Sequence, residues 1–289
     1  MMQWERIVER IDSLPPMPVV MSRLAVVLSD PDVDTMDIVE IIQYEPGLTA
    51  GILKMANSAY FGSVQSIASL RQAVARLGLD QIFRLVVISS AQSTMKRSVA
   101  GYDLPPGELW RHSVAAAIAT QFLAREIGVE HEEVAFTAAL LHDVGKLVIG
   151  NYMDVDFKAI EREAFGRGVS FEEAEREVLG ADHAQIGAAV LEKWNLPGQV
   201  IQPVRWHHDP DGTAPSRLVD IVHVADALCL SMGIGSGRDE LYYRPSEAAI
   251  ERCRVSKSAR EAVISHTLGA MDDFAELFAL PTTEVHHGL

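Results

Sequence analysis

The sequence predicts an all-α protein built from two helical lobes, and three observations lead to this prediction. Between residues 4 and 140, apolar residues recur three and four positions apart, which is typical of amphipathic helices. The alternation of apolar and polar residues that indicates β-strands is almost absent. Prolines stand where helices are expected to begin or end, and Pro46 suits the first position of a helix.

The first lobe is expected to cover residues 1–100 and to be a helical scaffold without histidines. Two apolar stripes predict consecutive helices, one with Met21, Leu24, Ala25 and Leu28 and the next with Ile38, Ile41 and Ile42. We expect Gly62 and Gly78 to end helices, because glycine adopts a left-handed backbone without steric cost.

The second lobe is expected to cover residues 101–289 and to carry all ten histidines. Residues 101–107 contain two glycines and two prolines between long helical patterns, so they are the predicted boundary between the lobes. Later helices are expected across residues 218–230 and, at the end of the chain, around residues 258–280.

Composition excludes several classes of protein. Of the 289 residues, 48% are hydrophobic, which is enough to build a core. The formal net charge of −15 predicts poor affinity for nucleic acids and anionic lipids. The two cysteines, Cys229 and Cys253, exclude a disulfide framework and a four-thiolate zinc site. With no export signal and no run of about 18 apolar residues, we expect a soluble cytoplasmic protein that binds neither nucleic acid nor membrane.

His142, Asp143 and Lys146 interrupt an apolar segment that predicts a single helix across residues 135–149. Burial of an unpaired carboxylate costs several kcal/mol, so something must compensate Asp143. A salt bridge to Lys146, three residues later on the same helix face, is one explanation. A bound metal ion is the other.

Other predicted helices also place metal-ligand residues on apolar, inward faces. These residues are His112, with Glu108 one turn before it, His183, which follows an N-cap at Asp182, the adjacent His207 and His208 at a helix end, and Asp226. Together with His142 and Asp143, they provide five imidazoles and two carboxylates, apart from Glu108. This mixed nitrogen and oxygen set suits iron, manganese, nickel, cobalt or zinc.

Seven ligands are too many for one ion, so the sequence predicts two divalent transition-metal ions bridged by Asp143. One ion would take His112, His142, Asp143 and Asp226, and the other Asp143, His183, His207 and His208. Paired ions can hold a phosphoryl oxygen and activate a water for in-line attack. The alternative is a polar core whose groups satisfy one another by hydrogen bonds, although crowded acidic and imidazole groups favour a cation. His223, one turn before Asp226, could support a ligand by a hydrogen bond.

The order of His112, then His142-Asp143, then Asp226 resembles the HD superfamily of metal-dependent phosphohydrolases. The additional His183 and His207-His208 resemble its HD-GYP branch, which hydrolyses cyclic di-GMP and binds two or three metals. This resemblance implies that Lys146 contacts substrate phosphate and that Glu108 ligates a third metal. The sequence after His208 lacks the Gly-Tyr-Pro motif of that branch, so the substrate stays open.

Six blocks in the first lobe resemble the HDOD family, the HD-related output domain of bacterial signalling proteins. They are Leu14-Pro-Pro-Met-Pro18, Asp30-Pro31, Glu45-Pro-Gly-Leu-Thr49, Asn57-Ser-Ala-Tyr-Phe-Gly62, Ser69-Leu70 and Leu77-Gly78. With the second lobe, the resemblance spans residues 14–230. It implies an N-terminal HDOD-type helical bundle packed on an HD-like helical bundle.

Two hypotheses about function therefore stay open. In the first, the chain is a signal-transduction output module with a two-ion metal centre, and it acts mainly by binding a signalling protein partner. In the second, it is a metal-dependent phosphohydrolase acting on a cyclic dinucleotide or another phosphoester, with Asp143 and Lys146 as its catalytic residues. A third hypothesis, an iron-based sensor of oxygen or redox state, follows from the ligand types alone.

Overall fold

The computed structural model confirms the all-α class. It describes residues 46–57, 67–78, 81–82, 84–88, 95–129, 132–235, 237–238 and 242–278, together with residues 7, 9, 11, 39, 42 and 43. Among these residues the regular elements are helices, and the only β-type pairing is an isolated bridge between Val99 and Leu104. The predicted stripe with Met21 and Leu28 and the predicted helix end at Gly62 lie outside the described residues.

The named helices follow one another along the chain in this order. They are α4 (Pro46–Ala56), α5 (Leu70–Leu77), the 3-10 helix η2 (Ala100–Tyr102), α7 (Glu108–Glu126), α8 (Glu132–Leu141), α9 (Val144–Tyr152), α10 (Phe157–Arg167), α11 (Phe171–Leu179), α12 (His183–Lys193), α13 (Gly198–Trp206), α14 (Arg217–Ser231), α15 (Glu247–Cys253) and α16 (Lys257–Phe278). Two predicted boundaries are confirmed, because Pro46 begins α4 and Gly78, with a φ of 78°, follows the end of α5.

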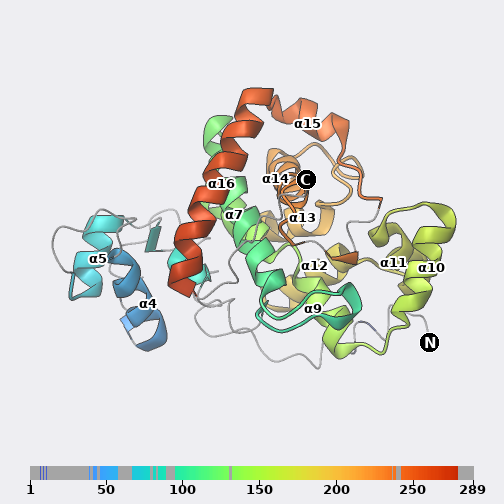
Figure 1. Cartoon of the computed structure of the whole chain (residues 1–289), viewed down its shortest axis with the longest axis horizontal. Helices are drawn as coiled ribbons and strands as arrows, with labels where there is room; N and C mark the ends of the chain where they lie inside the picture. Colours follow the sequence, from blue (N-terminus) through green and yellow to red (C-terminus); the bar gives the residue numbers. More distant parts are fainter. Residues whose placement is uncertain are drawn as a thin grey trace, which may run out of the picture.

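Helix α7 lies at the centre of the larger helical group, with α8, α14 and α16 packed on it (Figure 1). Its middle, from Ser113 to Ala124, carries no charged residue and is almost entirely buried. Alanines at 115, 116, 117 and 119 allow the neighbouring helices to approach closely. Helices α4 and α5 lie at one end of the molecule, and α10 and α11 form a pair at the other (Figure 1).

Helix α12 packs between α9 and α13, and two glycines set how close α9 comes. A Cβ at Gly145 would lie 1.9 Å from the carbonyl oxygen of His183, so only glycine fits there. A Cβ at Gly187 would lie 3.2 Å from the backbone nitrogen of Gly145. This contact brings the first turn of α9 against the first turn of α12, where Asp143 and His183 stand.

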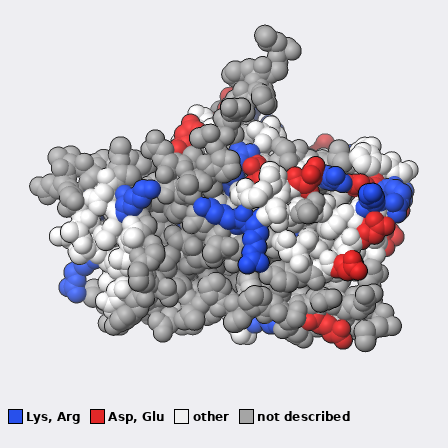
Figure 2. Space-filling view, turned by 60° about the horizontal axis from the view of Figure 1, so that its bottom comes forward, with Lys and Arg blue, Asp and Glu red and all other residues white. Residues whose placement is uncertain are grey.

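The surface of the described part of the chain is mixed in charge. On the face in Figure 2, basic and acidic side chains lie next to one another at the right-hand end. No helix in the described ranges combines the length and apolar character needed to cross a membrane. The predicted division of the chain at residue 100 stays a prediction.

The contact at Gly145 predicts a large and local effect on stability. We expect Gly145→Ala to lower the free energy of unfolding by roughly 2–4 kcal/mol, because the added methyl group meets rigid backbone. Gly166→Ala, in the exposed interior of α10, is the matched control, since a Cβ there meets no atom within 4 Å. It should stabilise the protein by about 0.5–1 kcal/mol. Urea denaturation measures both, and equal effects would contradict the packing argument.

Candidate metal centre

Five parts of the fold converge on one buried site. His112 lies on α7, His142 and Asp143 follow α8, His183 begins α12, His207 and His208 follow α13, and Asp226 lies on α14. Six of these seven side chains are buried, and His208 is partly exposed. The structure thus brings together all seven residues that the sequence assigns to a two-ion centre.

The predicted single helix across residues 135–149 is wrong. Helix α8 ends at Leu141 and α9 begins at Val144, so His142 and Asp143 form the turn between them. Asp143 is the N-cap residue of α9, but its side chain makes no capping hydrogen bond. The physical reason for the break is the close packing of Gly145 on α12, which requires α9 to start in a new direction.

The ligand atoms form two groups that share Asp143. In one, atoms of Asp143, His183, His207 and His208 all lie within 4.8 Å of one another, and in the other the same is true of His112, His142 and Asp143. Asp226 joins the second group, since its Oδ1 lies 3.0 Å from Nε2 of His112 and 3.6 Å from Nε2 of His142. This division matches the predicted assignment of ligands to two ions; that the groups bind metal stays a prediction.

Four of the five imidazoles, all but that of His208, are oriented by acceptors at their Nδ1 atoms. Three of them donate from Nδ1 to a carbonyl oxygen: His112 to Ile234 (2.9 Å), His142 to Ala139 (2.6 Å) and His207 to Val204 (2.8 Å). The fourth, His183, donates from Nδ1 to Glu175 Oε2 (2.8 Å). Because each acceptor fixes the proton on Nδ1, the Nε2 lone pair is free to face the centre. This is how metal-binding histidines are normally held.

Two of these acceptors come from helix ends. The last carbonyl groups of a helix have no partner within the helix. His142 follows the end of α8 and donates to Ala139 three residues back, and His207 follows the end of α13 and donates to Val204 in the same way. Each of these hydrogen bonds therefore gives a helix-end carbonyl a partner and also orients a histidine ring towards the centre.

Close contacts between ring nitrogens show that the described side chains alone do not satisfy the site. Nε2 of His112 lies 3.2 Å from Nε2 of His142, and two lone pairs at that distance repel unless a proton or a metal ion lies between the rings. Two nitrogens bound to one ion at about 2.1 Å would be roughly 3.0–3.4 Å apart, so the spacing fits a shared cation. Among the residues that the structure describes, buried Asp143 Oδ1 and His207 Nε2 have no hydrogen-bond partner, and the nearest ring nitrogen to that oxygen, Nε2 of His183, lies 3.4 Å away. These unpartnered atoms also fit a cation.

The charge balance of the site is negative. Three buried carboxylates, Asp143, Asp226 and Glu175, face one ammonium group, that of Lys146, which leaves two negative charges when the histidines are neutral. Burial lowers the pKa of His142, but attraction to Asp143 outweighs burial and the pKa rises to about 10. For His183, burial also lowers the pKa, and attraction to Glu175 raises it to about 10. Without metal, the site therefore holds protons on these two rings.

The predicted salt bridge between Lys146 and Asp143 is present. Lys146 Nζ lies 2.7 Å from Asp143 Oδ2, and the amine lies 5.9 Å from the ring centre of Tyr102. Burial alone would raise the pKa of Asp143, but His142 and Lys146 hold it well below its usual value. Because Lys146 uses only one carboxylate oxygen, the salt bridge and a metal on the other oxygen are compatible.

Glu108 is the predicted ligand that the structure does not bring to either group. Its carboxylate pairs with Arg111 and accepts a hydrogen bond of 3.2 Å from the backbone nitrogen of Gly235. His223 supports the site through the backbone, since its Nδ1 donates to the carbonyl oxygen of His207 at 2.6 Å and its Nε2 accepts from the nitrogen of Ser246 at 2.8 Å. Its contribution is the position of the chain at His207.

Sequence reasoning missed two side chains that contact the ligands. Glu175 is fully buried on α11 and accepts hydrogen bonds from the backbone nitrogen and from Nδ1 of His183. It also accepts a hydrogen bond of 2.6 Å from the hydroxyl of Tyr102. Its signal was present, because a carboxylate interrupts the apolar stripe of α11. Tyr243, whose hydroxyl donates to Asp226 Oδ2 at 3.4 Å, lies outside any helix and carries no periodic signal.

Comparison with known proteins finds matches over most of the chain. A family model described as the HDOD domain matches residues 14–210. A protein of Treponema pallidum (strain Nichols), called "Uncharacterized protein", is 29% identical over 206 residues, which are 70% of this chain and 39% of that protein. The chain thus spans less than half the length of that relative.

Two solved structures share the fold. An HDOD domain protein with unknown function from Geobacter sulfurreducens has a TM-score of 0.72 and 24% identity, over 96% of this chain and 95% of that one. A protein from Marinobacter aquaeolei VT8, called "Putative signal transduction protein", has a TM-score of 0.75 and 20% identity, over 96% of this chain and 66% of that one. At these identities the likeness establishes the fold.

The raised pKa values predict that metal and protons compete. Below pH 10, His142 and His183 carry an extra proton in the metal-free protein, and both must lose it before Nε2 can bind an ion. Metal binding at pH 7 should therefore release about two protons, and the apparent affinity should rise as the pH rises towards 10. Titration calorimetry in two buffers of different ionisation enthalpy measures this release. Equal heats in both buffers would contradict the prediction.

Proposed function

Because this chain belongs to the HDOD family, we propose that it is a signal-transduction output module whose second lobe holds two divalent transition-metal ions. One observation carries the proposal, the convergence of seven nitrogen- and oxygen-bearing side chains on one buried centre. Buried Asp143 Oδ1 and His207 Nε2, which have no hydrogen-bond partner among the described residues, support it because a cation would satisfy both.

The ligands divide between the two ions as their distances suggest. His112, His142, Asp143 and Asp226 would hold one ion, and Asp143, His183, His207 and His208 the other. Iron, manganese, nickel, cobalt or zinc suits this set. When bound, such a pair polarises a phosphoryl oxygen and lowers the pKa of water.

The surrounding residues hold this centre in place. Glu175 fixes the ring of His183 and keeps its proton on Nδ1, and Tyr102 in turn fixes Glu175. Lys146 balances part of the negative charge on Asp143 and leaves Oδ1 free. A signalling protein is the proposed partner of the module, as the name of the Marinobacter protein suggests.

The proposal predicts the metal content of the purified protein. Protein purified without added metal or nickel affinity resin should contain about two equivalents of transition metal, and Asp143→Ala should contain almost none, because both ions lose their shared ligand. Asp154→Ala, at an exposed aspartate, is the matched control and should keep the parent content. Mass spectrometry of the metals decides the matter. Metal-free parent protein would overturn the proposal.

A second candidate function is a metal-dependent phosphohydrolase acting on a cyclic dinucleotide or another phosphoester. One observation favours it, a pocket of about 350 Å³ whose lining includes His208. Since His208 is the one partly exposed member of the ligand set, a small molecule in the pocket would lie against a residue of the centre. Lys146, buried beside Asp143, is the cation placed to contact a phosphate that reaches the ions.

The two candidates differ in what Lys146 does. If the protein is a phosphohydrolase, Lys146→Met should keep the metal and lower the rate on bis(p-nitrophenyl) phosphate roughly 100-fold, because a cation that stabilises developing charge is lost. Lys158→Met, on the exposed face of α10, is the control and should match the parent. Release of p-nitrophenol gives the rate. A metal-loaded parent that hydrolyses neither this ester nor, in a separate chromatographic assay, cyclic dinucleotides would leave the output module as the function.

A further inference from the structure

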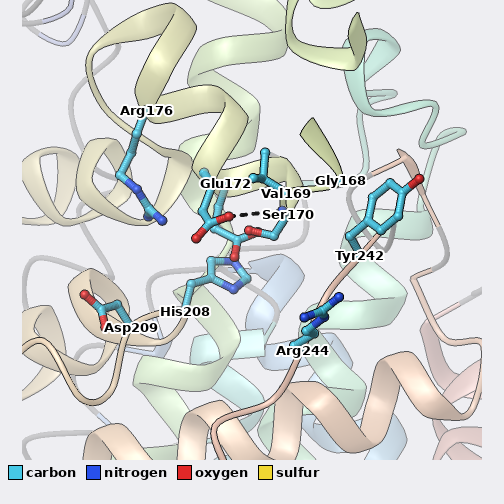
Figure 3. A pocket seen from close by; sticks show the side chains of 10 residues that line it. Gly168, Val169, Ser170, Glu172, Arg176, His208, Asp209, Tyr242 and Arg244 are labelled. Carbon is cyan, nitrogen blue, oxygen red and sulfur yellow. Dashed lines mark hydrogen bonds between the residues drawn. The ribbon is translucent and has the colours of Figure 1, made fainter. Parts of the chain in front are cut away.

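The pocket beside the metal centre is built from three separate segments. Its lining consists of Gly168, Val169, Ser170, Glu172, Glu173, Arg176, His208, Asp209, Tyr242 and Arg244. Figure 3 shows His208 and Glu172 in the middle of this lining, with Tyr242 and Arg244 on one side and Arg176 and Asp209 on the other. The wall shared with the metal centre is therefore the ring of His208, whose Nε2 lies 2.7 Å from Nε2 of His183.

An exposed aromatic pair stands at one side of the pocket. Tyr242 is 44% exposed and Phe165 is 55% exposed, and they are two of the three large hydrophobic residues exposed in the described part of the chain. Their ring centres are 6.3 Å apart in an edge-to-face arrangement. Tyr242 also has a left-handed backbone with a φ of 62°, which is unfavourable for a bulky residue. The chain thus holds an aromatic ring towards solvent at a conformational cost.

Two charged groups of the lining, one cation and one carboxylate, have partners within the fold. Arg176 pairs with Asp182, and Glu173 accepts a hydrogen bond from the backbone nitrogen of Ser170. Arg244 is exposed and makes no ion pair or hydrogen bond with any other residue that the structure describes. It is therefore the cation of the lining that is free to bind an anion, and it stands on the same side as Tyr242 (Figure 3).

We propose that this pocket binds one nucleoside monophosphate, with its base on the ring of Tyr242 and its phosphate between Arg244 and the metal centre behind His208. Stacking of a base on an exposed aromatic ring and pairing of a phosphate with a guanidinium are the two contacts that the lining offers. Glu172 adds a buried carboxyl group that accepts hydrogen bonds from ribose hydroxyls. The inference rests on the proposed metal centre and names the ligand class of its pocket.

Size and charge favour one nucleotide over a nucleic-acid chain. A volume of about 350 Å³ lies near the lower end of the range for ligand pockets, about 300–1,000 Å³. The lining has three carboxyl groups and two guanidinium groups, and the whole chain has a net charge of −15, so a long polyanion is repelled. For the same reason a single phosphate should bind tightly only when the metal ions add positive charge.

The test uses the full chain, loaded with Mn²⁺ and freed of excess metal, and titrates it with AMP and with ribose 5-phosphate. Tyr242→Asn removes the ring while keeping a residue that accepts a left-handed backbone, and it should weaken AMP binding roughly tenfold without changing ribose 5-phosphate binding. Tyr242→Phe should bind AMP like the parent. Arg244→Gln should weaken the binding of AMP and of ribose 5-phosphate roughly tenfold. Arg71→Gln, at an exposed position of α5, is the control and should change the binding of neither.

The outcomes separate this inference from the proposed function. If the parent holds metal but AMP binding is absent, or is unchanged in Tyr242→Asn, the inference is overturned and the metal centre stands. If the parent takes up no metal, the metal measurement overturns the proposed function. AMP is then titrated into metal-free protein, and the pocket is supported if Tyr242→Asn weakens AMP binding and overturned if it does not. Tighter binding of a 5′-phosphorylated hexanucleotide than of AMP would overturn the single-nucleotide assignment.

Discussion

The burial of Asp143 is the constraint on which the rest of the candidate metal centre depends. A carboxylate that is 1% exposed must be compensated within the fold, and Lys146 compensates only one of its oxygens. The other oxygen faces the imidazoles of His183, at 3.4 Å, and His207, at 3.9 Å. The packing of Gly145 on α12 forces the turn that puts the carboxylate there, so backbone contact and site chemistry have one origin.

Helix ends, more than helix faces, create this arrangement. His142 and His207 each follow the last residue of a helix and bind a carbonyl of its final turn, and His183 occupies the first position of α12. Side chains at such positions are held by backbone groups that would otherwise lack partners. The remaining support comes from Glu175, which Tyr102 holds in turn, from His223 and from Tyr243.

The sequence was sufficient for the helical class and for the seven converging residues, because periodicity marks inward positions and the ligand types are rare on apolar faces. It also predicted that Asp182 precedes the first residue of α12. It could not show the turn at Asp143, since the apolar run continues through it and a single glycine within a helix is ordinary. Tyr243 was invisible because irregular segments are placed by tertiary contacts alone.

One segment touches both the pocket and the metal centre. Tyr242 and Arg244 line the pocket, and Tyr243 between them places its hydroxyl 3.4 Å from Asp226 and its ring against His208. If the proposed nucleotide moved Tyr242 or Arg244, it would also move Tyr243, and with it the surroundings of Asp226 and His208. If such a molecule changed the affinity for the metal ions by some factor, thermodynamic reciprocity would require the metal ions to change the affinity for the molecule by the same factor. Three consecutive residues would thus suffice to make the lobe a coupled receptor for an ion and an organic ligand.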